Sequence, residues 1–354
     1  MNRKSVTSRD VAKLAGVSQS AVSRSFSPDA KVAEKTRKKV MAAARELGYR
    51  PNSIARSLIT RSSRTIAVVT YSLENPFYSF MLEKASRYFQ QQGYHLQLFF
   101  APSDNGFDTV IDDIIRSQVE GVLMLAITLD STQAKEVADF GIPCVVINRT
   151  VNFDGISQVG SDNHSGGYWA GHYLASLGHR RIAYIAGLPN SSTDLQRKAG
   201  FLEGLAKDGL TCHAVEIGNY RYADACHATR RLFASLPSPD ALFCANDLMA
   251  IAAIDTLRHE FGLSVPEDVS IIGFDDVPMA AWPSHSLTTL KQPVEFMASK
   301  ATELLMAQIN QVDTAPENIM LPVTPMLRSS TRRSIHHSKK SLKELSDAHH
   351  RSAR

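Results

Sequence analysis

Seven short apolar runs recur between residues 65 and 333, and stretches with helical spacing fill the gaps between them. The runs are IAVV (66–69), HLQLFF (95–100), GVLML (121–125), PCVVI (143–147), RIAYIA (181–186), ALFCA (241–245) and VSIIG (269–273). Apolar strands that alternate with helices, for example 77–92 and 163–177, indicate parallel sheets covered on both faces. Seven units are too many for one small sheet. We therefore expect an α/β body of two doubly wound lobes, with a ligand cleft at the carboxyl ends of the strands.

The first residues have a different, wholly helical pattern. Residues 6–26 read VTSRDVAKLAGVSQSAVSRSF, in which Val11, Leu14 and Ala15 share one helical face. Gly16 then ends that helix, and Ser18 is a good N-cap for a second one. Two short helices joined by a turn that contains glycine predict a helix-turn-helix.

A third helix follows at about 33–47, and Gly48 stops it. The next stretch, YRPNSIARSLITRSSR (49–64), is too short for a helix that is stable alone, so we place a hinge and linker there. The chain then divides into a helix-turn-helix domain (1–48), the hinge (49–64), the two-lobed body (65–333) and a basic tail (334–354). The tail lacks apolar periodicity, and we expect it to be disordered.

Charge is unevenly distributed over the 354 residues. Residues 1–64 hold 15 Lys and Arg against 4 Asp and Glu, whereas residues 65–333 hold 19 against 29. A basic head on an acidic body predicts a polyanion partner for the head alone. The alternative is a solvated, flexible basic arm.

Several classes of protein are disfavoured. No apolar run is long enough to cross a membrane, and the first residues do not resemble a secretory signal, so we expect a cytoplasmic protein. The four cysteines form no CxxC pair, and the histidines of the tail have no fixed scaffold, so we expect no metal and no cofactor. No GxSxG, HExxH, P-loop or GxGxxG motif points to an enzyme.

An ordered set of motifs adds a family resemblance. The head sequence, followed by KTRKKVMAAARELGYRPNSIARSL, resembles the DNA-binding head and hinge of the lactose/galactose/purine repressor family of bacterial transcription regulators. The body carries ENPFYS, VVINR, LGHRRIAYIAG, QRKAGF, ANDLMA, VSIIGFDD and LTTLKQP in the order typical of that family. The resemblance covers about residues 5–333 and implies a body of the periplasmic-binding-protein type.

The second helix of the head carries the side chains that suit base recognition. Gln19 can pair with adenine, Ser20 is a tolerant donor and acceptor, and Arg24 can make two bonds to guanine. The resemblance implies that these three residues read a half-site. It also implies phosphate contacts, which fix register without reading sequence, from Thr7, Ser18, Ser23, Lys31 and Asn52. The alternative is a surface helix with exposed polar residues.

In the hinge, the resemblance implies that Leu58 wedges into the central base step, with the small Ala55 close to the minor groove. The alternative for Leu58 is packing onto the body. Ala33 departs from the family, which usually has serine at the start of the third helix. The departure removes an N-cap worth about 0.5–2 kcal/mol.

Polar residues that follow the strands of the body are candidates for effector binding. The resemblance implies that effectors are held at the positions of Phe77, Asn148, Arg197, Asn246 and Asp275; we add Asn75 and Arg149 at strand ends, and Tyr220 and Trp282 as possible aromatic walls. An aromatic face with arginine, amide and carboxylate groups suits the paired hydroxyls of a sugar. We interpret Asp247 and Asp276 as structural, since an aspartate after a strand often caps the next helix.

The class of effector stays open at this point. Arg149 and Arg197 together favour an anionic group, and Asn148 stands where the family often has aspartate. Arg149 can instead form a salt bridge between lobes. We expect a sugar or a sugar acid.

The sequence therefore predicts a DNA-binding transcription regulator of the repressor type, controlled by a small effector. One head reads too few base pairs for specificity, so a homodimer on a pseudo-palindromic operator is expected. The tail has no leucine heptads that would join dimers. The alternative is a sugar-binding transport protein with the same body fold.

Overall fold

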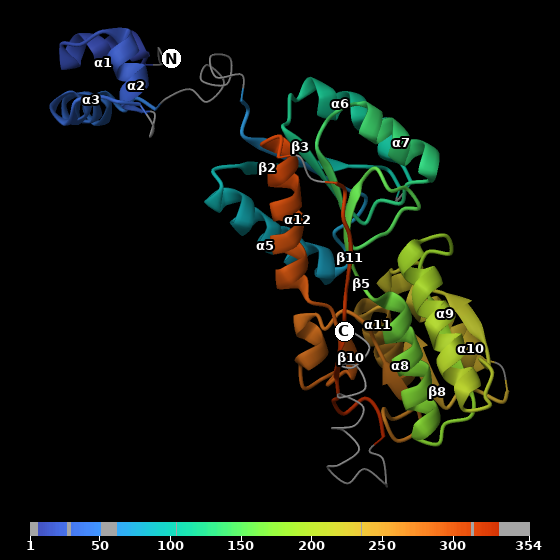
Figure 1. The fold of residues 1–354 in the computed structure, drawn as a ribbon. Coiled ribbons are helices and arrows are strands. Elements are labelled where there is room, and N and C mark those ends of the chain that lie inside the picture. Colours follow the sequence, from blue (N-terminus) through green and yellow to red (C-terminus); the bar gives the residue numbers. More distant parts are fainter. Residues whose placement is uncertain are drawn as a thin grey trace, which may run out of the picture. The chain divides into compact units, whose positions relative to one another are not determined.

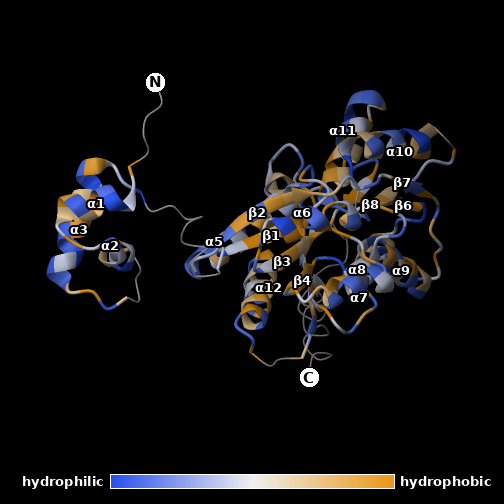
Figure 2. Cartoon of the chain, turned by 90° about the horizontal axis from the view of Figure 1, so that it is seen from above, coloured by the Kyte–Doolittle hydropathy of each residue, from blue (hydrophilic) through white to orange (hydrophobic). Residues whose placement is uncertain are grey.

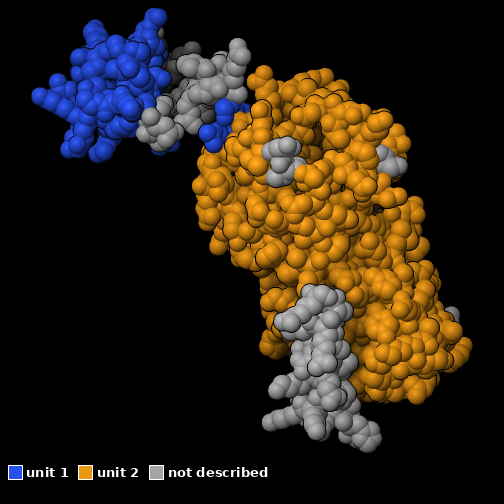
Figure 3. Space-filling model, in the orientation of Figure 1, with its two compact units in different colours: residues 1–64 blue, residues 65–354 orange. Residues whose placement is uncertain are grey.

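The computed structural model describes residues 6–26, 30–50, 62–103, 105–234, 236–312 and 315–332. The chain divides into two compact units, residues 1–64 and 65–354 (Figure 3). Each unit is described by itself.

The head contains α1 (Ser8–Ala15), α2 (Gln19–Ser25) and α3 (Glu34–Leu47) (Figure 1). At the start of α1, the backbone N–H and the hydroxyl of Thr7 both donate to Asp10 Oδ2, at 2.9 and 2.7 Å. Gly16 ends α1 with φ +64°, and Ser18 accepts from the backbone N–H of Ala21 to begin α2. These caps form the helix-turn-helix that the sequence predicts.

One small core holds the head together. It consists of Val11, Ala12, Val22, Val40, Ala43 and Ala44, with Leu47, Phe26 and Tyr49 packed around it. The expectation for Leu14 was wrong, because its side chain is 46% exposed. Helix α1 turns Ala12 inward instead, so Leu14 falls on the side of α1 that the other two helices leave open.

The first lobe is built on six parallel strands in the order β11-β5-β4-β3-β1-β2. The strands are β1 (Thr65–Thr70), β2 (His95–Phe100), β3 (Gly121–Leu125), β4 (Cys144–Ile147), β5 (Ser157–Ser161) and β11 (Asn318–Leu321). Helices α5 (Pro76–Gln91) and α12 (Val294–Ile309) cover one face, and α6 (Ile111–Arg116) and α7 (Ser131–Asp139) the other. Successive side chains of β1 point to opposite faces of the sheet. Ile66 and Val68 therefore pack on the α5 side, whereas Ala67 and Val69 pack on the α6 side.

The second lobe has four parallel strands in the order β7-β6-β8-β9, and a β10–β12 antiparallel pair. Its strands are β6 (Ile182–Ala186), β7 (Val215–Ile217), β8 (Ala241–Cys244), β9 (Ser270–Ile272), β10 (Thr289–Lys291) and β12 (Thr324–Met326). Its helices are α8 (Asn163–Ser176), α9 (Ser192–Lys207), α10 (Tyr222–Ala234) and α11 (Asp247–Glu260). The chain crosses between the lobes after β5, after β10 and between β11 and β12.

The predicted pair of parallel-sheet lobes is confirmed, and hydrophobic residues gather along both sheets (Figure 2). Strands β5, β7, β10, β11 and β12 were not among the seven predicted runs, and β2 is less buried than predicted. Strand β2 lies at the edge of its sheet and is not covered on both faces, since Leu98 and Phe100 are 39% and 54% exposed. The polar strand β5 was not predicted, yet it is buried, because Gln158 exchanges two 2.8 Å hydrogen bonds with the backbone of Val151. Among the described residues, none of the helices combines the length and the apolar character needed to cross a bilayer.

Candidate functional site

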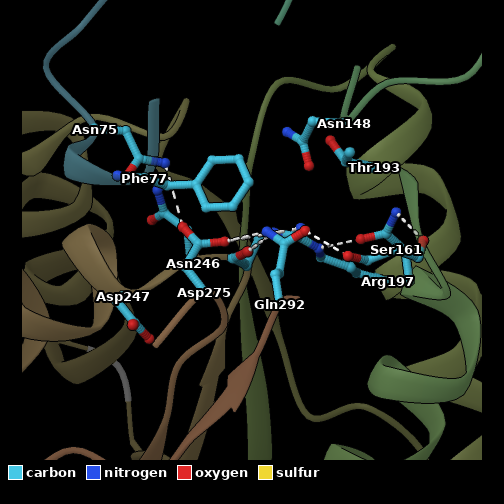
Figure 4. A network of polar contacts seen from close by, with 12 residues as sticks. Asn75, Phe77, Asn148, Ser161, Thr193, Arg197, Asn246, Asp247, Asp275 and Gln292 are labelled. Carbon is cyan, nitrogen blue, oxygen red and sulfur yellow. Dashed lines mark hydrogen bonds and ion pairs between the residues drawn. The ribbon is translucent and has the colours of Figure 1, made fainter. Parts of the chain in front are cut away.

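Polar side chains from both lobes converge where the parallel strands end. Asn75 follows β1, Asn148 follows β4, Asn246 follows β8 and Asp275 follows β9, and α9 contributes Arg197 (Figure 4). All five residues are at most 6% exposed. Four residues that follow strands and Arg197 on α9 thus form one buried cluster between the lobes.

Asp275 is the centre of the cluster. Its carboxylate accepts from Asn75 Nδ2 at 3.3 Å and from Gln292 Nε2 at 2.6 Å. The Nη2 atom of Arg197 lies 4.0 Å from Asp275 Oδ1. Burial raises the pKa of Asp275 to about 6, while the charge of Arg197 and the two amide donors act in the opposite direction. Asp275 therefore connects the first lobe, the second lobe and a crossover segment.

Arg197 is fixed by three further contacts. Its Nε donates to Asn163 Oδ1 at 2.8 Å, and its Nη1 donates to the carbonyl oxygen of Ala245. The guanidinium carbon lies 3.6 Å from the centre of the Phe274 ring. These contacts use Nε, Nη1 and one face of the guanidinium. Nη2 therefore supplies most of the donors that remain, and it points toward Asp275.

The first lobe supplies an aromatic and amide side to the cluster. Phe77 is 2% exposed, and its ring meets that of Tyr78 edge-on at 5.4 Å between centroids. Asn148 has φ +71° and donates through Nδ2 to the Tyr78 hydroxyl at 3.5 Å. Arg149 is 1% exposed and donates to Thr128, which belongs to the same lobe.

Tyr220 and Trp282, the two residues expected as aromatic walls of the effector site, lie in different surroundings. Tyr220 is 6% exposed, and its hydroxyl lies 3.0 Å from Thr193 Oγ1. The prediction for Trp282 was wrong: its side chain is 53% exposed at the end of the short turn Pro278–Ala281. Among the described residues, no hydrogen bond, ion pair or ring contact joins the Trp282 side chain to the cluster.

Two buried amide atoms in the cluster lack hydrogen-bond partners among the described residues. They are Asn148 Oδ1, an acceptor, and Asn246 Nδ2, a donor. The other amide atom of Asn246 caps α11 by accepting from Met249 N at 3.0 Å. Leaving a buried polar group unpaired costs about 1–3 kcal/mol, so this pair of atoms suits a ligand that offers both a donor and an acceptor.

Several cluster residues were not predicted from the sequence. They are Tyr78, Ser161, Asn163, Thr193 and Gln292. Ser161 ends β5 and Gln292 directly follows β10, where the chain crosses between the lobes, and the two side chains hydrogen-bond each other at 2.7 Å. Gln292 stands within the motif LTTLKQP, and that motif was the available signal.

The two aspartates interpreted as caps are structural, but neither is an N-cap of the next α-helix. Asn246 caps α11, whereas Asp247 accepts from the backbone N–H of Val277 at 2.9 Å and from the Thr289 hydroxyl. Asp276 pairs with Arg328 at 2.6 Å. Both carboxylates therefore tie the segment after β9 to neighbouring strands.

The residues assigned to DNA in the head lie on its surface. Ser18, Gln19, Ser20, Ser23 and Arg24 on or beside α2 are exposed, as are Thr7 and Lys31. Gln19 Nε2 donates to Ser8 Oγ at 2.9 Å, and Arg24 Nε to the Ser20 carbonyl at 3.4 Å. Helix α2 therefore presents a row of polar side chains to the solvent. Asn52, Ala55 and Leu58 lie outside the described residues.

Comparison with known proteins gives matches over nearly the whole chain. Residues 7–52 match the model "Bacterial regulatory proteins, lacI family", and residues 172–331 match "Periplasmic binding protein-like domain". The HTH-type transcriptional repressor PurR of Aliivibrio salmonicida (strain LFI1238) is 32% identical, over 93% of this chain and 99% of the relative.

Two solved structures extend the likeness to three dimensions. The lac repressor dimer bound to operator and the anti-inducer ONPF has a TM-score of 0.82 at 28% identity, covering 93% of this chain and 100% of that one. A complex of the transcriptional regulator CelR with cellobiose has a TM-score of 0.70 at 31% identity, covering 92% and 99%. The head, the two-lobed body and these relatives together establish that the chain belongs to the lacI family of bacterial regulatory proteins and is a DNA-binding transcription regulator.

Proposed function

We propose that the buried cluster between the lobes binds a polyhydroxylated effector, a sugar or a sugar acid, and that this effector controls operator binding. The observation that carries the proposal is the 4.0 Å separation of Arg197 Nη2 and Asp275 Oδ1. That separation exceeds hydrogen-bond length, and both atoms are buried. One hydroxyl group can accept from the arginine and donate to the carboxylate.

The remaining cluster residues support the same class of ligand. Asn148 Oδ1 and Asn246 Nδ2 are a buried acceptor and a buried donor without partners among the described residues. A further hydroxyl group satisfies either atom. Phe77 adds an apolar surface suited to the face of a sugar ring. The cellobiose bound to the related CelR is consistent with this assignment.

The head is the DNA-binding part of the same switch. We propose that the exposed side chains of α2 read an operator half-site, and that two copies of the chain bind a pseudo-palindromic operator, as the lac repressor dimer binds its operator. Such a protein acts where bacterial DNA lies, in the cytoplasm. The match of residues 7–52 to a regulator head favours this function over sugar transport.

A thermal-shift screen tests the effector class directly. The full chain is heated with D-ribose, cellobiose or D-glucuronate, and operator affinity is measured with each sugar. At least one of them should raise Tm and change operator affinity in the wild type but not in Arg197→Ala. The matched control is Arg230→Ala, which removes a surface arginine paired with Glu260. The absence of any sugar effect in the wild type would overturn the proposal.

A further inference from the structure

The contacts of Arg197 point to another residue on which effector binding depends. Asn163 opens α8 and is 1% exposed, and its Oδ1 accepts from Arg197 Nε. Its Nδ2 donates to the Ser161 carbonyl at 3.0 Å and lies 3.4 Å from Gln196 Oε1. Because the amide nitrogen is held by two acceptors, the amide oxygen is held toward Arg197.

The backbones of α8 and α9 hold these two residues at a fixed distance. A Cβ atom on Gly167 would lie 2.0 Å from the carbonyl oxygen of Arg197, and one on Gly200 would lie 1.9 Å from that of His164. Only glycine permits such close approach, so α8 and α9 touch backbone to backbone. Asn163 and Arg197 therefore form one rigid unit.

This unit determines which donors of Arg197 remain for a ligand. Nε is used by Asn163, Nη1 by Ala245, and the face by Phe274. Without Asn163 the buried Nε would have to find another acceptor, and the nearby carboxylate of Asp275 is the strongest acceptor beside it. A direct Arg197–Asp275 pair would close the 4.0 Å gap.

We propose that Asn163 is a positioning residue that holds Arg197 at a distance from Asp275, so that one effector hydroxyl can bind both. The proposal rests on the sugar-class effector proposed above. It adds a residue that need not touch the ligand but sets the geometry of the two that do.

Titration of wild type and variants with D-ribose, cellobiose and D-glucuronate tests the role. Asn163→Ala should weaken binding of the sugar that binds the wild type by about 10- to 100-fold, because Arg197 can then pair directly with Asp275 and the sugar must break that pair. Operator affinity without sugar should change less than about twofold. Asn163→Asp keeps an acceptor for Nε and should recover at least about half of the lost binding free energy. His164→Ala, next along α8 on the exposed side, should bind normally.

A double variant separates positioning from general destabilisation. If Asn163 acts through Arg197, adding Asn163→Ala to Arg197→Ala should weaken sugar binding no further. Normal sugar binding by Asn163→Ala, or an Asp variant as weak as the Ala variant, would overturn the proposal. If the wild type binds none of the three sugars, the proposed effector class fails instead. In that case, the free energies of unfolding of the single and double variants test whether Asn163 acts through Arg197. If the losses of the two single variants add up in the double variant, the proposed role of Asn163 is overturned.

Discussion

Burial changes the acid–base behaviour of the cluster at the scale of single residues. Asp275 has a pKa raised by burial to about 6, and Asp247, behind it, has a pKa raised by burial to about 8. Since both folded-state values lie above those of an exposed aspartate, the folded state holds these protons more tightly than the unfolded state. Their contribution to stability is therefore present at low pH and is lost as the pH rises through these raised values.

Ligand binding should have the opposite pH dependence. A hydroxyl that donates to Asp275 needs the ionised carboxylate, so sugar affinity should fall as the pH drops from 7.5 to 5.5. Calorimetric titration at pH 5.5, 6.5 and 7.5 measures it. Asp275→Asn should bind weakly with a flat profile, and a wild-type affinity that rises toward pH 5.5 would contradict the assignment.

The sequence revealed the cluster residues that follow clearly apolar strands. Asn75 was chosen because it follows an apolar run, and Asn148, Asn246 and Asp275 both follow such runs and match positions that the family resemblance implies. Ser161 and Gln292 were missed because β5 is polar and β10 is only three residues long. A strand whose polar side chains are satisfied by backbone groups leaves no hydropathy signal.

At the scale of elements, the seven strongly apolar strands followed from local chemistry, whereas the polar strand β5 and the short strands β7, β10, β11 and β12 did not. Strand β2 looked like a buried strand, because hydropathy cannot tell which strand ends a sheet. The α8–α9 contact was also invisible in sequence. Glycine at positions 167, 171, 200 and 204 becomes meaningful only when the two backbones are seen to touch.

That contact gives an element-scale prediction. Gly200→Ala would place a methyl group 1.9 Å from the carbonyl oxygen of His164, so the two helices must separate. We expect a loss of about 1–3 kcal/mol or more in the free energy of unfolding, measured by urea denaturation. Ala199→Gly, the exposed neighbour on α9, is the matched control and should cost about 1 kcal/mol through helix propensity alone. Equal stability of Gly200→Ala and the wild type would show that the helices separate without cost.

A substitution at the start of α3 should increase stability instead of lowering it. Ala33 stands at the N-cap with extended backbone angles and makes no side-chain cap. Ala33→Ser supplies an oxygen for a backbone N–H of the first turn and should stabilise the head by about 0.5–2 kcal/mol. The thermal transition of the head reports this, with Ala30→Ser as a control that adds a hydroxyl outside the cap. An unchanged midpoint would mean that the first-turn amides already have adequate partners in water.

At the scale of the whole molecule, a basic head and an acidic body divide the two functions. The 15 Lys and Arg residues of 1–64 favour the DNA backbone, while the excess of acidic residues in 65–333 keeps the body from adding nonspecific contacts. The proposed effector cluster is formed by both lobes and two crossover segments, so its occupancy should be sensitive to how the lobes are arranged. A ligand that binds one lobe arrangement more tightly increases the population of that arrangement. The size of the increase is set by the difference between the ligand's affinities for the two arrangements.

Coupling between sugar and operator follows from that preference and must be reciprocal. If the sugar changes operator affinity by some factor, the operator must change sugar affinity by the same factor, corresponding to about 1–3 kcal/mol. Parallel titrations, with and without the other ligand, measure both factors.

Arg197→Ala should lose the sugar response while the head still binds DNA, because the arginine lies in the body and α2 in the head. Leu58→Ala, in the predicted hinge, should weaken specific operator binding and spare the sugar. An Arg197→Ala variant that still responds to sugar would place the effector elsewhere in the body.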